Sequence, residues 1–105
     1  MKVLILEDEQ PAVDHLTALL RAYDKTIEIS AIFDSVKDVV AWLQTNPSPD
    51  LIFMDIQVAD GLCFDIFGLV QVQSPVIFTT AFQEYAIRAF KVNSVDYLLK
   101  PIDFT

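Results

Sequence analysis

The stretch Leu51-Ile52-Phe53-Met54-Asp55 is a run of four apolar residues that stops at a carboxylate. Three further short apolar runs also stop at polar groups. These are Val3 to Leu6 before Glu7-Asp8, Val76 to Phe78 before Thr79-Thr80, and Tyr97 to Leu99 before Lys100. Such short, uniformly apolar strands are typical of a parallel sheet that helices cover on both faces. The chain is therefore predicted to be an α/β protein whose strands end in reactive polar groups.

The segments between these runs predict the covering helices. A helix is expected over about residues 10 to 23, because Pro11 suits its first turn and an apolar stripe follows. This stripe would consist of Ala12, Leu16, Leu19 and Tyr23. A second helix is expected after Ser35, which forms a capping-box pattern with Asp38. Later helices are expected over about residues 83 to 90 and, before that, around Leu62, Ile66 and Phe67.

The strand order follows from one strand that differs from the others. Ile27, Ile29 and Ala31 alternate with polar residues, as is expected of a strand at the edge of a sheet. The alternation of strands and helices implies right-handed crossovers and a parallel sheet. With the second strand at an edge, the predicted order is 2-1-3-4-5. The switch point then lies between strands one and three, which places Asp8 beside Asp55.

Three carboxylates are expected at this switch point, from Glu7, Asp8 and Asp55. Two such charges about 4 Å apart would repel each other by about 4 kcal/mol at an effective dielectric constant of about 20, so a cation must offset them. Oxygen ligands without His or Cys favour a hard ion. A site of few carboxylates plus water suits Mg²⁺ better than Ca²⁺, and Mn²⁺ would substitute for it.

The same edge of the sheet carries the groups that phosphoryl transfer requires. A carboxylate in such a site can act as a nucleophile toward phosphorus, and Asp55 is the candidate. The Lys100 ammonium and the Thr80 hydroxyl would neutralise charge on the phosphoryl oxygens. Thr79 remains an alternative to Thr80, although alternation along the strand and the following Ala81 favour Thr80.

Length and composition restrict the class of protein. The 105 residues are sufficient for one domain with a single core. With 15 acidic and 7 basic side chains the net charge is −8, which disfavours direct binding to nucleic acid. Cys63 is the single cysteine, so a disulfide framework is excluded. The chain has neither a signal peptide nor a run of about 18 apolar residues, so a cytoplasmic protein without a membrane segment is expected.

The chain resembles the receiver domain of a two-component response regulator over all 105 residues. The resemblance rests on the acid pair Glu7-Asp8, the segment Met54-Asp55-Ile56, Thr80-Ala81, and Tyr97-Leu98-Leu99-Lys100-Pro101. In addition, residues 84–90 and 92–97 are similar to the LytTR-type subfamily, whose regulators carry a DNA-binding domain after the receiver.

The resemblance implies a function and a role for each site residue. Asp55 would accept a phosphoryl group from a sensor histidine kinase, and the domain would then switch conformation to control a downstream DNA-binding domain. Asp8, Asp55 and the backbone carbonyl of Gln57 would ligate Mg²⁺, with Glu7 acting through water. The resemblance further implies that the domain catalyses only its own phosphoryl transfer and dephosphorylation, so it is not expected to be an enzyme in the ordinary sense.

The resemblance also implies a fold and an assembly. The fold would be flavodoxin-like (CheY-like), doubly wound around a parallel sheet of five strands, with Thr80 and Tyr97 as the switch pair. Residues 1–105 would form the receiver domain without its fifth helix, which should begin at Thr105, and without the effector domain. A homodimer is expected, and contact with DNA is expected only through the effector domain.

The loop after Asp55 departs from the family pattern. The segment from Gln57 to Gly61 lacks the usual Pro and is about two residues shorter. The sequence therefore leaves the path of this loop open.

Two other classes of protein share parts of the expected site. A phosphatase of the haloacid-dehalogenase type also uses an Asp nucleophile with Mg²⁺, but it would need a second Asp where Gln57 stands. A flavodoxin-like electron carrier would need a phosphate-binding loop after the first strand. That place holds Glu7-Asp8-Glu9, whose charges repel phosphate.

Overall fold

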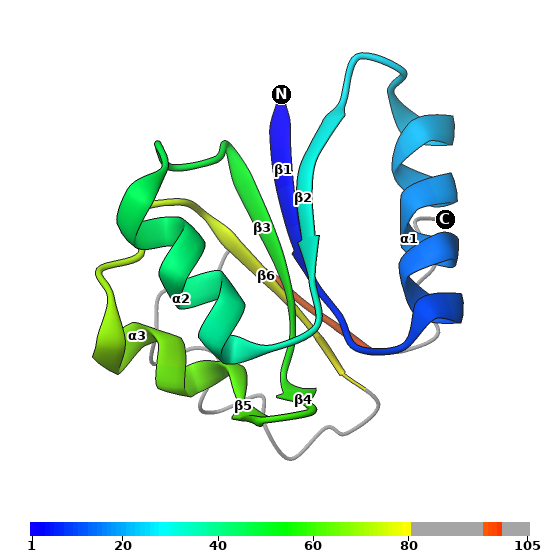
Figure 1. The fold of residues 1–105 in the computed structure, drawn as a ribbon. Helices are drawn as coiled ribbons and strands as arrows, with labels where there is room; N and C mark the ends of the chain where they lie inside the picture. Colours follow the sequence, from blue (N-terminus) through cyan, green and yellow to red (C-terminus); the bar gives the residue numbers. More distant parts are fainter. Residues whose placement is uncertain (81–95, 100–105) are drawn as a thin grey trace.

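The computed structural model describes residues 1–80 and the backbone of residues 96–99. Its central sheet consists of β1 (Lys2–Leu6), β2 (Glu28–Phe33), β3 (Leu51–Asp55), β6 (Val76–Thr80) and β7 (Asp96–Leu99). These strands are parallel and lie in the order β2-β1-β3-β6-β7, which confirms the predicted order 2-1-3-4-5 (Figure 1). β2 therefore lies at an edge, and β1 lies beside β3.

Helices cover both faces of the sheet, as the uniformly apolar strands predict. These helices are α1 (Gln10–Tyr23), α2 (Val36–Thr45) and α3 (Ile66–Leu69). α1 lies on one face, and α2 and α3 lie on the other (Figure 1). Among the described residues, no helix combines the length and the apolar character that crossing a bilayer demands.

The side chains of β1 show how the sheet divides the core. Val3 and Ile5 pack in the cluster under α1, while Leu4 and Leu6 pack in the cluster under α2 and α3. All of them are at most 1% exposed. Because β1 is buried on both faces, its sequence is continuously apolar and carries no alternation.

α1 has the predicted bounds, but its buried stripe differs from the predicted one. The side chains that it buries are Val13, Leu16 and Leu20. Ala12 and Leu19 are half-buried, and the prediction that Tyr23 faces the sheet is wrong, because Tyr23 is 78% exposed. Both the predicted and the observed stripe contain Leu16, and in each the apolar residues recur at intervals of three or four, as a helix requires. Only the position of the sheet selects between them.

The predicted start of α2 is confirmed. The Ser35 hydroxyl accepts a hydrogen bond from the backbone N–H of Asp38 at 3.2 Å, which satisfies one of the free donors of the first turn. The helix ends at Thr45, directly before the segment Asn46-Pro47-Ser48-Pro49.

The segment after β3 forms a hairpin before it becomes helical. β4 (Gln57–Val58) pairs antiparallel with β5 (Gly61–Leu62), and a short 3₁₀ helix, η1 (Cys63–Asp65), leads into α3. The prediction that Leu62 belongs to the third helix is therefore wrong. The hairpin turn needs a positive φ, which Gly61 supplies at +141°. The helix expected over residues 83 to 90 lies outside the described residues.

Candidate functional site

Two neighbouring strands bring three carboxylates together at the C-terminal edge of the sheet. Leu6 of β1 is the register partner of Met54 of β3, so Glu7 and Asp55 follow at the same level. One carboxylate oxygen each from Glu7, Asp8 and Asp55 lies within 4.8 Å of the others. The structure therefore places side by side the three acids that the strand order predicts at the switch point.

Backbone hydrogen bonds fix the acid pair at the junction of β1 and α1. The N–H of Glu7 donates to the carbonyl of Phe33 at 2.9 Å, which extends the pairing of β1 with β2 by one residue. The Glu7 carboxylate accepts the N–H of Glu9 at 3.2 Å. The Glu9 carbonyl then accepts the N–H of Ala12 at 3.0 Å in the first turn of α1. The connection between strand and helix is thus short, and its acids stay at the edge of the sheet.

The three carboxylates concentrate negative charge in a partly dehydrated place. Glu7 and Asp55 are 6% and 5% exposed, whereas Asp8 is exposed. Desolvation, followed by the negative charge of Glu7, raises the pKa of Asp8 above its usual value. A cation would relieve this repulsion. Because the donors of this set are all carboxylate oxygens, they fit a hard ion such as Mg²⁺ better than a softer metal.

Buried Ile56 fixes the backbone that follows Asp55. Its N–H donates to the carbonyl of Thr79 at 3.0 Å, and its carbonyl accepts the N–H of Cys63 at 2.8 Å. Its side chain is fully buried. Gln57, whose carbonyl is an expected metal ligand, comes next as the first residue of β4. Gln57 therefore directly follows a residue whose N–H and carbonyl are both hydrogen-bonded to neighbouring segments.

The two candidate hydroxyls end β6, next to β3. Thr79 is 3% exposed and Thr80 is 1% exposed. Thr79 is the register partner of Asp55. Ile77 packs in the cluster under α1 and Phe78 in the cluster under α2 and α3. By the alternation of a strand, Thr79 then belongs to the α1 face and Thr80 to the opposite face.

The remaining expected residues lie on or after the last strand. The backbone of Tyr97 in β7 is in register with Phe78, and Leu99 is in register with Thr80. The side chain of Tyr97, and Lys100 as a whole, lie outside the described residues.

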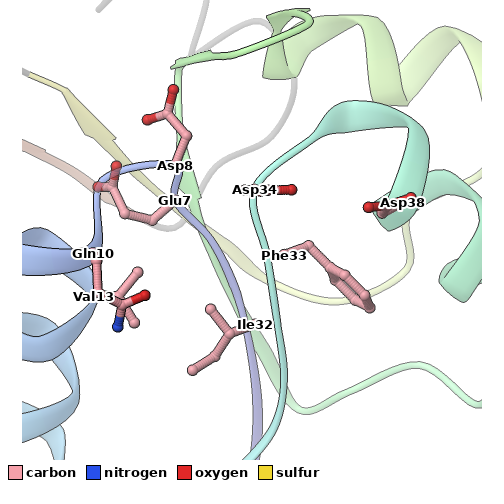
Figure 2. Close-up of a pocket in the computed structure, with 8 residues that line it drawn as sticks. All are labelled: Glu7, Asp8, Gln10, Val13, Ile32, Phe33, Asp34 and Asp38. Carbon is pink, nitrogen blue, oxygen red and sulfur yellow. The ribbon is translucent and has the colours of Figure 1, made fainter.

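A cavity of about 290 Å³ adjoins the acid pair. It is lined by Glu7, Asp8, Gln10, Val13, Ile32, Phe33, Asp34 and Asp38 (Figure 2). Figure 2 shows Asp34, on the connection from β2 to α2, and Asp38, in the first turn of α2, across from Glu7 and Asp8. Sequence reasoning missed Asp34 and Asp38 as part of this edge. The sequence contains a signal for Asp34, because the apolar pair Ile32-Phe33 is followed by this acid, as the other apolar runs are followed by polar groups. The alternation of apolar and polar residues earlier in β2 made this signal hard to recognise.

Comparison with known proteins agrees with this architecture. A family profile described as "Response regulator receiver domain" matches residues 3–105. The sensory transduction protein LytT of Bacillus anthracis is 40% identical over 106 residues, which cover 98% of this chain and 42% of that protein. The transcriptional regulatory protein BtsR of Salmonella typhi is 36% identical over 105 residues, covering 98% of this chain and 43% of that protein. The chain thus spans less than half the length of these curated relatives.

Solved structures show the same fold. The response regulatory domain of protein mrkE from Klebsiella pneumoniae has a TM-score of 0.84 and 37% sequence identity, covering 98% of this chain and 85% of that chain. A DNA-binding response regulator of the LuxR family from Staphylococcus aureus has a TM-score of 0.82 at 20% identity, covering 97% of this chain and 88% of that chain. The arrangement of strands is therefore shared even where few residues are.

Proposed function

Because the chain belongs to the response regulator receiver family of two-component systems, we propose that Asp55 is its phosphoacceptor, with a sensor histidine kinase as the donor. The observation that carries this assignment is the place of Asp55. It ends the central strand β3, it is 5% exposed, and its carboxylate lies within 4.8 Å of those of Glu7 and Asp8. A phosphatase or an electron carrier would require a different residue at Gln57 or a different loop after β1.

In the proposed transfer, a carboxylate oxygen of Asp55 attacks the phosphorus of the kinase phosphohistidine. A P–O bond forms to Asp55 as the P–N bond breaks, and the electron pair of that bond stays on the histidine nitrogen. Lys100 and the Thr80 hydroxyl donate hydrogen bonds to the phosphoryl oxygens. Attack by water on the same phosphorus later restores the free carboxylate. The domain thus acts only on itself and turns over no separate substrate.

The acid cluster would hold one Mg²⁺ ion, for which Mn²⁺ could substitute. Asp8, Asp55 and the carbonyl of Gln57 are the proposed ligands, and Glu7 would orient a water. When bound, the ion neutralises charge on the phosphoryl oxygens. The donor set supports this proposal, because carboxylate and carbonyl oxygens are ligands that suit a hard cation. Burial and the negative charge of Glu7 raise the pKa of Asp8, and a bound cation would offset this charge.

Phosphorylation is proposed to act on transcription through the rest of a longer protein. Thr80 and Tyr97 would relay the change, and an effector domain would bind DNA, with the regulator working as a homodimer in the cytoplasm. Two observations support this output. The chain spans less than half of LytT and BtsR, and these relatives are named as a sensory transduction and a transcriptional regulatory protein.

The assignment is tested by incubating the chain with acetyl phosphate and Mg²⁺ and recording intact-mass spectra. The wild-type chain should gain the mass of one phosphoryl group, and Asp55→Asn should gain none. Asp34→Asn is a matched control, because it removes an acid of the neighbouring cavity and leaves the cluster intact. Equal phosphoryl addition to the Asp55→Asn variant would contradict the assignment.

A further inference from the structure

The hairpin that follows Asp55 is tied to the start of α2 by one side chain. Asp60, in the turn between β4 and β5, contacts residues that lie more than twenty positions earlier in the sequence. Its Oδ1 accepts the N–H of Val36 at 2.8 Å, and its Oδ2 accepts the N–H of Lys37 at 3.1 Å. Both carboxylate oxygens are therefore engaged by consecutive peptides of one helix.

These contacts complete the cap of α2. The first N–H groups of a helix have no partner within the helix, and anions are favoured beside them. Ser35 satisfies the N–H of Asp38 from within its own segment. Asp60 satisfies the two preceding donors, and its hydrogen bonds from Val36 and Lys37 lower the pKa of its carboxyl below the usual value. Asp60 is thus ionised at neutral pH, and its hydrogen bonds are charge-assisted.

The segment between Asp55 and Asp60 is fixed near both of its ends. Ile56 is bonded to Thr79 and Cys63, as described above. At the other end, Asp60 is bonded to α2. Gln57 lies between these anchors, in the short pairing of β4 with β5. A hairpin of two-residue strands has little stability of its own, so its position depends on such anchors.

We propose that Asp60 is a positioning residue for the divalent ion. By anchoring the hairpin on α2, it holds the backbone carbonyl of Gln57 toward the carboxylate cluster. This inference rests on the proposed function, which names Gln57 as a ligand. Since coupling between two places is reciprocal, ion binding at the cluster should also strengthen the contacts of Asp60 with Val36 and Lys37.

The test compares two ways of weakening the same helix cap in the full 105-residue chain. Asp60→Ala removes the tie to the hairpin. Ser35→Ala removes the other capping side chain and leaves the hairpin tied, so it is the matched control. Mg²⁺ is titrated by amide NMR. Asp60→Ala should weaken Mg²⁺ binding by about tenfold, in the range found for groups that orient metal ligands. Ser35→Ala should change it by less than about twofold.

A second measurement needs no metal. In metal-free protein, amide hydrogen exchange at Cys63 should become faster in Asp60→Ala and remain unchanged in Ser35→Ala, because only the first variant frees the hairpin. Asp60→Asn keeps one acceptor oxygen and should accelerate exchange at Cys63 to an intermediate extent. This variant replaces Asp60→Ala in the test if the alanine variant does not fold.

The outcomes separate the two proposals. If the wild-type chain binds no Mg²⁺, the proposed function itself is overturned. If the wild-type chain binds Mg²⁺ and Asp60→Ala binds it as tightly as Ser35→Ala does, the positioning role is overturned while the proposed function stands.

Discussion

Thr79 is the register partner of Asp55 across β3 and β6, and its carbonyl accepts the N–H of the next residue, Ile56, at 3.0 Å. Thr79 therefore supports the Asp55 segment through its backbone, which another residue of the same shape would preserve. Thr80 follows it at the end of the strand, 1% exposed. The hydroxyl groups of Thr79 and Thr80 are therefore expected to differ in their contribution to the output of the regulator.

Thr80→Ala should permit phosphorylation of Asp55 but reduce output from the full-length regulator by about tenfold, since a hydrogen bond to a charged group is worth roughly 1.5 to 3 kcal/mol. Thr79→Val, which keeps the shape and the backbone contact, should leave output nearly unchanged. The measurement is transcription from a reporter controlled by the regulator, alongside phosphorylation by intact mass. Normal output from Thr80→Ala would contradict the role of Thr80 as the relay, and loss of output only in Thr79→Val would assign that role to Thr79.

Asp8 should make the metal-free domain less stable as pH rises. Its folded pKa is raised above 3.8, so its contribution to stability is fully present below that pH and is lost as pH rises through the raised value. Asp8→Asn should therefore stabilise the metal-free domain at pH 7, by less than about 1 kcal/mol because the side chain is exposed. It should also remove most of the stabilisation by Mg²⁺. Urea unfolding with and without Mg²⁺ measures both effects, and a less stable metal-free variant would contradict the charge argument.

Asp60 should show the opposite dependence. Its folded pKa is lowered from 3.8, so its contribution is present above that pH and is lost as pH falls through the lowered value. Unfolding curves of the wild-type chain and Asp60→Asn should converge in acid and separate near neutral pH, with the variant less stable. A constant difference at all pH values would indicate that the carboxylate charge plays no part in the cap.

The core under α2 and α3 should depend strongly on Phe78. Its ring is fully buried and lies 5.3 Å from the ring of Phe64 and 6.0 Å from that of Phe67, measured between centroids. Phe78→Ala should lower the free energy of unfolding by about 3 to 5 kcal/mol. Leu69→Ala is the control in the same region, because Leu69 is 62% exposed and its truncation should cost less than about 0.5 kcal/mol. Similar losses from both variants would show that this face is packed differently.

The strands and their order could be predicted because a strand that is buried on both faces is apolar at every position, and this is visible in the local sequence. Leu51 to Met54 is apolar at every position, and only a strand covered from both sides needs that. The proximity of the carboxylates at the ends of β1 and β3 then follows from the strand order alone. The buried stripe of α1 could not be selected from the sequence, because Leu16 belongs to two adjacent apolar stripes and the position of the sheet decides which of them is buried.

The hairpin after Asp55 could not be predicted for a different reason. Its strands have two residues each, too few for a period, and its position depends on Asp60 contacting Val36 and Lys37, far away in the sequence. Asp34 was missed because β2, as an edge strand, alternates where the inner strands do not. Long-range contacts and edge positions thus account for what the sequence pattern did not reveal.

If Asp55 carries the phosphoryl group, that group can be located in the chain by chemical reduction. Reduction of an aspartyl phosphate with borohydride converts the residue to homoserine, which peptide mass spectrometry can place in the chain. After treatment with acetyl phosphate, homoserine is expected in place of Asp55 alone, and only when Mg²⁺ is present. Homoserine in place of Asp8, or a phosphoryl group that survives reduction on a threonine or on His15, would contradict it.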